Sequence, residues 1–154
     1  MLCRGLSPRQ SEKDIMHDEE IIQQQIVLFD GICNLCNGSV NFVLKHEEDP
    51  IFRFTSIQSE TGKQLLKWCG LPDGFNDAVI YIENGTIHQG STAALKIGQS
   101  LKFPWSMISS VGLLVPKVIR DWVYQQLATY RYQWFGKRDV CMVPTKELRA
   151  RFYD

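Results

Sequence analysis

The sequence has no surplus of charge and no long apolar run, and both absences exclude classes of protein. Lys and Arg together number 17, as do Asp and Glu, so no net charge attracts the chain to nucleic acid or to an anionic membrane. The longest apolar stretch, residues 107–115, is far shorter than the roughly 20 residues that span a bilayer. We therefore expect a protein that binds neither nucleic acid nor a membrane.

The features of a secreted protein are also missing. No apolar run follows the basic residues near the start of the chain, as it would in a secretory signal, and the acidic residues there are unfavourable for a transit peptide. The cysteines are odd in number and only one pair is close, unlike a secreted disulfide framework; they are Cys3, Cys33, Cys36, Cys69 and Cys141. We expect a cytoplasmic protein.

The length and composition suit one globular domain behind a polar tail. The 154 residues are 44% apolar, which is enough to bury a sizeable core. Residues 1–25 are polar and show no periodicity, so we expect a flexible tail. Residues 1–15 are expected to be dispensable for stability because they contain little apolar surface. Residues 26–154 are expected to form the domain.

The start of the domain has the pattern of a strand, a helix and a second strand. Residues 26–29 form a short apolar run typical of a buried strand. Apolar positions recur at helical spacing from residue 34 to about 45, and residues 51–55 alternate as a strand does. Consecutive strands joined by a helix pair in parallel through a right-handed crossover.

The pattern continues with a helix over 61–69, a strand over 78–82 and a returning strand over 86–88. Asn84-Gly85 between these strands favours a type I′ turn, because both residues tolerate positive φ. Ser91 is expected to cap the next helix. The order β-α-β-α-β-β-α predicts an α/β fold, the mixed four-stranded sheet flanked by helices that thioredoxins have.

Two further helices are expected within residues 104–136, as a C-terminal helical extension of this domain. The second, over 117–135, has an apolar stripe, and we expect the two helices to cover an edge or a face of the sheet. The stripe consists of Val118, Ile119, Trp122, Val123 and Leu127.

Cys33-Asn34-Leu35-Cys36 is the strongest chemical signal. Thiol–disulfide exchange needs one acidified thiol that attacks and a second within reach that resolves the mixed disulfide. At the start of a helix, unpaired N–H groups and the helix dipole favour the thiolate. We therefore predict that Cys33 is the exposed nucleophile and that Cys36 is the resolving thiol, which turns inward.

Half of a zinc site is the competing interpretation of this pair. Zinc usually takes four ligands from two closely spaced pairs. The sequence has no second Cys-x-x-Cys and no histidine pair at suitable spacing. Redox chemistry without a metal or an organic cofactor is therefore favoured over zinc.

The residues from Asp30 to Cys36 resemble the motif of the DCC family of thiol–disulfide oxidoreductase-like proteins, named for its Asp, Cys and Cys. Residues 131–138, followed by Cys141 and Pro144, are similar to the C-terminal signature of that family. The resemblance covers about residues 26–145. It implies a thioredoxin-like fold and oxidoreductase activity, and it implies no particular substrate.

Asp30 has two interpretations of equal weight. A buried carboxylate three residues before Cys33 could accept a proton from the resolving thiol. Equally, Asp is a common turn residue, because it accepts hydrogen bonds from backbone N–H groups two or three residues later. The more isolated cysteines have a simpler interpretation, since Cys69 and Cys141 lie among apolar residues and suit core packing.

Positive charge for the thiolate has to come from elsewhere in the chain, because residues 26–44 contain no Lys, Arg or His. The helix dipole alone stabilises an anion by about 0.3–1 kcal/mol at an exposed terminus. We predict that residues 131–141 return to the redox site and that Arg138 supplies the charge. Asp77 is a candidate for substrate contact, since it occupies the position where thioredoxins have a partner-docking cis-proline.

Two functions from different classes therefore remain. The first is a monomeric enzyme that exchanges a Cys33–Cys36 dithiol or disulfide with a protein or a small thiol partner. The second is a thioredoxin-like binding module without turnover, which could hold zinc through the same two cysteines. The sequence favours the enzyme.

Overall fold

A mixed β-sheet forms the centre of the molecule in the computed structural model, which describes residues 24–72, 75–76, 78–137 and 151–153. The strand order is β4-β3-β1-β2-β5. β1 pairs in parallel with β2 and antiparallel with β3, and β3 pairs antiparallel with β4. The strands are β1 (Gln25–Phe29), β2 (Phe52–Ser56), β3 (Ile80–Glu83), β4 (Thr86–Gln89) and β5 (Phe152–Tyr153).

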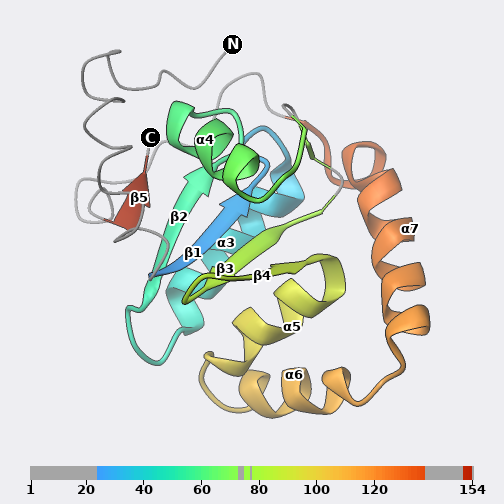
Figure 1. Cartoon of the computed structure of the whole chain (residues 1–154). Helices are drawn as coiled ribbons and strands as arrows, with labels where there is room; N and C mark the ends of the chain where they lie inside the picture. The colour runs from blue at the N-terminus through green and yellow to red at the C-terminus, as the bar shows by residue number, and fades with distance from the viewer. Residues whose placement is uncertain (1–23, 73–74, 77, 138–150, 154) are drawn as a thin grey trace.

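Helices cover both faces of this sheet (Figure 1). α3 (Asn34–His46) and α5 (Gly90–Gln99) supply Val40 and Ile97 to the core on one face, and α4 (Glu60–Trp68) supplies Leu65 and Leu66 to the core on the other. Residues 26–29 of β1 are buried throughout because this strand lies between both cores. The predicted thioredoxin-like arrangement is therefore confirmed.

The hairpin between β3 and β4 turns where the sequence predicts it. Asn84 and Gly85 both have positive φ, at 48° and 84°, as a type I′ turn requires. The other predicted elements are present with boundaries shifted by one or two residues, such as α4 over residues 60–68 in place of 61–69.

One strand and one helix cap differ from the prediction. A fifth strand, β5, pairs in parallel with β2, and Arg151 beside it donates from Nε to the carbonyl of Phe52 (3.2 Å). Ser91 does not cap α5, because the capping position belongs to Gln89. The Ser91 hydroxyl instead donates to Asp121 Oδ1 (2.5 Å), which ties α5 to α7.

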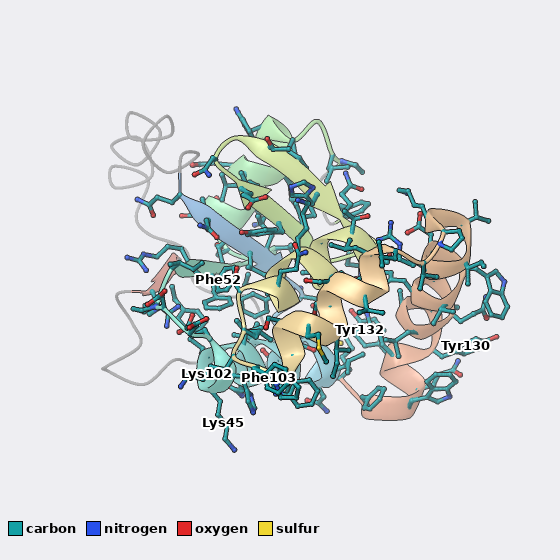
Figure 2. All side chains as sticks on the ribbon, turned by 90° about the horizontal axis from the view of Figure 1, so that it is seen from below. Lys45, Phe52, Lys102, Phe103, Tyr130 and Tyr132 are labelled. Atoms are coloured by element: carbon teal, nitrogen blue, oxygen red, sulfur yellow. The ribbon has the colours of Figure 1, made fainter. Side chains whose placement is uncertain are left out.

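The two C-terminal helices are α6 (Trp105–Leu113) and α7 (Lys117–Phe135). Most of the apolar stripe predicted on the second helix is exposed to solvent. Val118 is 82% exposed and Trp122 is 65% exposed. Tyr130, farther along α7, also points away from the body of the molecule (Figure 2).

α7 faces the sheet with a set of side chains that shares only Leu127 with this stripe and is spaced at three or four residues: Tyr124, Leu127, Ala128 and Arg131. The Tyr124 hydroxyl accepts a hydrogen bond from the Val79 N–H (2.9 Å). None of the described helices is long and apolar enough to cross a membrane. The predicted tail lies almost wholly outside the described residues.

Candidate active site

Cys33 lies at the junction between strand β1 and helix α3. Its backbone is extended (φ −82°, ψ 123°), and its sulfur accepts a hydrogen bond from the Cys36 N–H (3.4 Å), so Cys33 is the N-cap of the helix. Its carbonyl accepts the N–H of Asn37 and so begins the helical hydrogen bonds. The sulfur of Cys33 therefore lies where the backbone N–H groups and the dipole of a 13-residue helix stabilise negative charge.

The prediction that Cys33 faces solvent is wrong, since its exposed fraction is 0%. Residues 135–137, at the end of α7, lie against it. Lys137 forms an antiparallel β-bridge with Cys33, and the Asn34 N–H donates to the Gly136 carbonyl (3.3 Å). The Asn34 side chain also donates from Nδ2 to the Phe135 carbonyl (2.8 Å). We refer to residues 135–137 as the cover.

Gly136 is required in this cover for two reasons. Its φ of +83° lies in the region that L side chains rarely adopt. A Cβ atom at this position would also lie 2.9 Å from Asn34 Nδ2, the group that fastens the cover to the helix. The close approach of the two segments thus depends on the absence of a side chain.

Cys36 has different surroundings one turn later on α3. It is partly buried, and burial raises the pKa of its thiol to about 12. The hydrogen bond and the charge of Cys33 contribute to this shift after burial, whereas the positive charge of Arg131 opposes it. Cys36 therefore keeps its proton at neutral pH, as the resolving thiol of an exchange pair does before it reacts.

Asp30 joins the redox motif to α7. Oδ1 of Asp30 accepts from the Ile32 N–H (3.2 Å) and from Gln58 Nε2 (2.7 Å). Oδ2 accepts from Arg131 Nη2 (3.2 Å) and from the Tyr132 hydroxyl. The bond to Ile32 is the one that the turn interpretation of Asp30 predicts. Four donors fill the roughly four acceptor positions of a carboxylate, so Asp30 has no vacant one directed at Cys36.

Arg131 is a buried cation beside the motif that the sequence-based choice missed. Its side chain is 7% exposed and pairs with an Asp30 side chain that is 2% exposed. It also donates to the Asn76 carbonyl, and its charge acts on Cys36. Arg131 belongs to the C-terminal signature singled out in the sequence, but Arg138 was chosen there for its guanidinium. Arg131 was not considered as the cation, because a sequence does not show which side chains turn inward.

The predicted return of this segment is confirmed for its described part, residues 131–137, which contact Asp30, Cys33 and Asn34. Arg138, Asp77 and Cys141 lie outside the described residues. Cys69 packs against the core beside α4, as expected, and burial raises the pKa of its thiol to about 11. No group of three or more His, Cys, Asp or Glu in the described chain could hold a metal ion.

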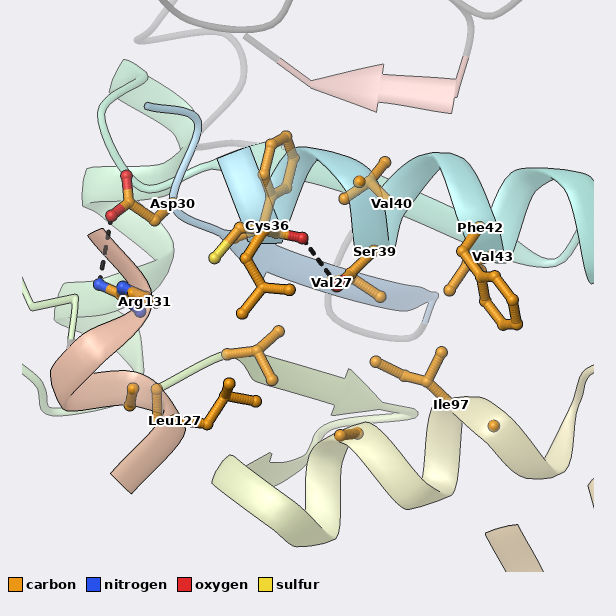
Figure 3. Close-up of a pocket in the computed structure, with 18 of the residues that line it drawn as sticks. Val27, Asp30, Cys36, Ser39, Val40, Phe42, Val43, Ile97, Leu127 and Arg131 are labelled. Atoms are coloured by element: carbon orange, nitrogen blue, oxygen red, sulfur yellow. Dashed lines mark hydrogen bonds and ion pairs between the residues drawn. The ribbon is translucent and has the colours of Figure 1, made fainter. Parts of the chain in front are cut away.

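A cavity of about 680 Å³ adjoins the motif. It lies between the sheet and helices α3, α5, α6 and α7, and Cys36 is part of its wall. In Figure 3 the Asp30–Arg131 pair closes one end, and apolar side chains from α3 and α5, among them Val40 and Ile97, continue away from that end. The site therefore combines a covered sulfur, a protonated thiol and an apolar space beside that thiol.

The chain is similar in sequence to known proteins. Residues 27–137 match the DCC1-like thiol-disulfide oxidoreductase family. The uncharacterized protein YuxK of Bacillus subtilis is 46% identical over 133 residues, which cover 86% of this chain and 96% of that protein. A chloroplastic DCC family protein of Arabidopsis thaliana is 38% identical over 119 residues, covering 77% of this chain and 69% of that protein. No solved structure matches.

Proposed function

Because this chain belongs to the DCC1-like thiol-disulfide oxidoreductase family, we propose that Cys33 and Cys36 exchange a dithiol for a disulfide with a protein or a small-molecule partner. The observation that carries the proposal is the position of Cys33 at the N-cap of α3, with the Cys36 N–H donating to its sulfur. A sulfur in that position is favoured as a thiolate, the form that attacks disulfides.

The proposed reaction has two steps. The Cys33 thiolate attacks one sulfur of the partner disulfide, the partner's S–S bond breaks, and one thiolate leaves and takes a proton from water. Cys36 then loses its proton to solvent and attacks the Cys33 sulfur, which releases the second partner thiolate. The partner gains two electrons and the Cys33–Cys36 pair becomes a disulfide.

Arg131 and Asp30 have different roles in this proposal. The charge of Arg131 lowers the pKa of Cys36, so it stabilises the thiolate that forms in the second step. Asp30 holds Arg131 in place through a buried ion pair and hydrogen-bonds the turn before Cys33. Asp30 is therefore proposed as a positioning residue.

The cover has to move before the first step, because no surface of Cys33 is exposed. Among the described residues, the cover is held to the motif by the β-bridge between Cys33 and Lys137, which includes the bond from the Asn34 N–H to the Gly136 carbonyl, and by the Asn34 side-chain bond to the Phe135 carbonyl. A net contribution of about 0.5–1.5 kcal/mol for each hydrogen bond leaves opening within thermal reach. We propose that partner binding displaces residues 135–137.

Trapping a mixed disulfide tests the proposal. Cys36→Ser leaves the attacking thiol but removes the resolving one, so a disulfide reagent should remain attached to Cys33, as intact-mass and peptide analysis would show. Cys69→Ser is the matched control, because this thiol lies away from the motif. In this variant both steps of the exchange should still occur, and no mixed disulfide should remain. Attachment to Cys69 and not to Cys33 would contradict the assignment.

A further inference from the structure

The cavity beside Cys36 has the size of a binding site for a small organic molecule. Its volume of about 680 Å³ lies within the range of pockets that enclose drug-sized ligands. Strand β1 forms its floor, and α3, α5, α6 and α7 form its walls. The Cys36 sulfur projects from α3 toward the α7 side of this space (Figure 3).

The wall of the cavity is almost free of unpaired charge. Asp30 and Arg131 are its only charged lining residues within the described chain, and they pair with each other. Most of the other lining side chains are aliphatic or aromatic. A charged ligand would lose its hydration in this space without gaining a partner of opposite charge, whereas water has few hydrogen-bond partners there and is readily displaced by an apolar group.

We propose that this cavity binds the apolar body of an uncharged small-molecule thiol or disulfide, and that it thereby selects the substrate of the Cys33–Cys36 pair. The inference rests on the proposed function, since the thiol pair gives the bound molecule its reaction. When a substrate sulfur reacts with Cys33 at the start of α3, the apolar group attached to that sulfur lies beside Cys36 and can enter the cavity. Charged disulfides are excluded by the same wall.

Two disulfides that share one leaving group test the selectivity. Octyl pyridyl disulfide and hydroxyethyl pyridyl disulfide both release pyridinethione, whose absorbance follows a single turnover of the reduced full-length protein. Burial of the additional methylene groups should make the octyl compound react at least about 30-fold faster, after correction for the rates of both compounds with a free alkyl thiol. Equal corrected rates would overturn the inference and leave the proposed function intact.

A cavity-filling substitution locates the effect. Ala128 lies on the inward face of α7 and lines the cavity. Ala128→Trp should remove the preference for the octyl compound, and Ala94→Leu on the α5 wall should reduce it. Gln125→Trp is the matched control, because Gln125 is exposed on the same helix. Gln125→Trp should react with the octyl and hydroxyethyl compounds at the same rate ratio as the parent protein. Loss of the octyl preference in this control alone would contradict the assignment of the preference to the cavity.

Binding of an unreactive dye separates the cavity from the thiol chemistry. Prodan is an uncharged naphthyl ketone whose emission shifts to the blue in apolar surroundings. It should bind with one-to-one stoichiometry to the Cys33→Ser/Cys36→Ser variant and should bind at least about 10-fold more weakly when Ala128→Trp is added. Absence of binding, or equal binding to both proteins, would overturn the cavity as a ligand site. Absence of reaction with either disulfide would overturn the proposed function and the substrate assignment with it.

Discussion

Cys33 and Cys36 lie one turn apart on the same helix, but the regions around them differ in access and in charge. Cys33 is at the N-cap, where the backbone N–H of Cys36 points at its sulfur, and it is fully buried with residues 135–137 lying against it. Cys36 forms part of the wall of a cavity, and burial raises the pKa of its thiol to about 12. The proposed nucleophile, Cys33, is therefore buried, whereas Cys36 borders the cavity and remains a protonated thiol.

This difference indicates how the reduced protein can avoid indiscriminate oxidation. A molecule that reaches only the cavity meets a thiol, which is a poor nucleophile, and the better nucleophile is reached only when the cover opens. Arg131 connects the two regions, because α7 carries it beside Cys36 and ends in the cover. Breaking its ion pair should disturb both regions at once.

Arg131→Ala is expected to have the largest effect on stability. It leaves the buried Asp30 carboxylate without its cation, and removal of one partner of a buried pair typically costs about 3–5 kcal/mol. In a domain of this size the thermal midpoint should fall by roughly 10 °C. Calorimetry of Arg131→Ala measures this shift.

Arg120→Ala is the matched control, because Arg120 is less buried on the same helix and pairs with no carboxylate oxygen among the described residues. Its midpoint should fall by less than a third as much. The double variant Asp30→Asn/Arg131→Gln removes both charges, so its thermal midpoint should lie above that of Arg131→Ala. Equal losses for Arg120→Ala and Arg131→Ala would show that the buried pair is not what holds α7 to the motif.

The pH dependence of Cys36 alkylation should separate the two thiols. Burial is the first cause of its raised pKa and is still present in Cys33→Ser, so the rate with iodoacetamide should increase about tenfold per pH unit from pH 7 to pH 10 without levelling. A plateau below pH 9 would contradict the raised pKa. The raised pKa also links the free energy of unfolding to pH, because the Cys36 thiol keeps its proton in the folded protein at pH values where the unfolded chain, with an ordinary pKa of 9.0, has lost it. This contribution to the stability of the fold is complete below pH 9 and is lost as the pH rises through about 12.

Loosening the cover should expose Cys33. Asn34→Ala removes the hydrogen bond from Nδ2 to the Phe135 carbonyl, and the loss of about 1 kcal/mol should speed alkylation of Cys33 roughly fivefold. Peptide mapping after brief alkylation distinguishes Cys33 from Cys36. Ser39→Ala, which removes an exposed bond within α3, should leave the Cys33 rate unchanged. A Cys33 rate that does not respond to Asn34→Ala would show that the cover does not limit access.

The smallest effect is expected on the outer face of α7. Trp122→Ala removes a side chain that is 65% exposed and should change the free energy of unfolding by less than about 0.5 kcal/mol. Tyr124→Phe, on the inner face, leaves the Val79 N–H without its acceptor and should cost about 1–2 kcal/mol. Denaturant unfolding compares them, and a larger loss for Trp122→Ala would mean that the outer face is packed in solution.

Local patterns were sufficient to predict much of the fold. The apolar run of β1, the helical spacing of α3 and the Asn84-Gly85 turn each depend on neighbours in the sequence, and the structure has all three. β5 was missed because a pairing of two residues leaves no periodicity to detect. The apolar stripe of α7 correctly indicated a helix, but periodicity does not specify what packs against a helix face.

The site was predictable only where it depends on local sequence. The position of Cys33 at a helix start follows from the motif itself. Its burial does not, because the cover lies about a hundred residues farther along the chain and depends on the positive φ of Gly136. The ion pair of Arg131 with Asp30 was not predictable for a similar reason, since the inward direction of a side chain is set by how α7 docks. The prediction for Arg138 stays a prediction, because this residue lies outside the described residues.

The central claim is that Cys33 and Cys36 form one reversible redox pair, and equilibration of the full-length protein in mixtures of oxidised and reduced dithiothreitol tests it most directly. Peptide mass analysis after acid quenching measures the state of each thiol. We predict that Cys33 and Cys36 are oxidised together within one chain, that both return to thiols under reducing conditions, and that Cys69 stays free throughout. A Cys33 that remains a thiol at every ratio, or that pairs with a cysteine other than Cys36, would contradict the account.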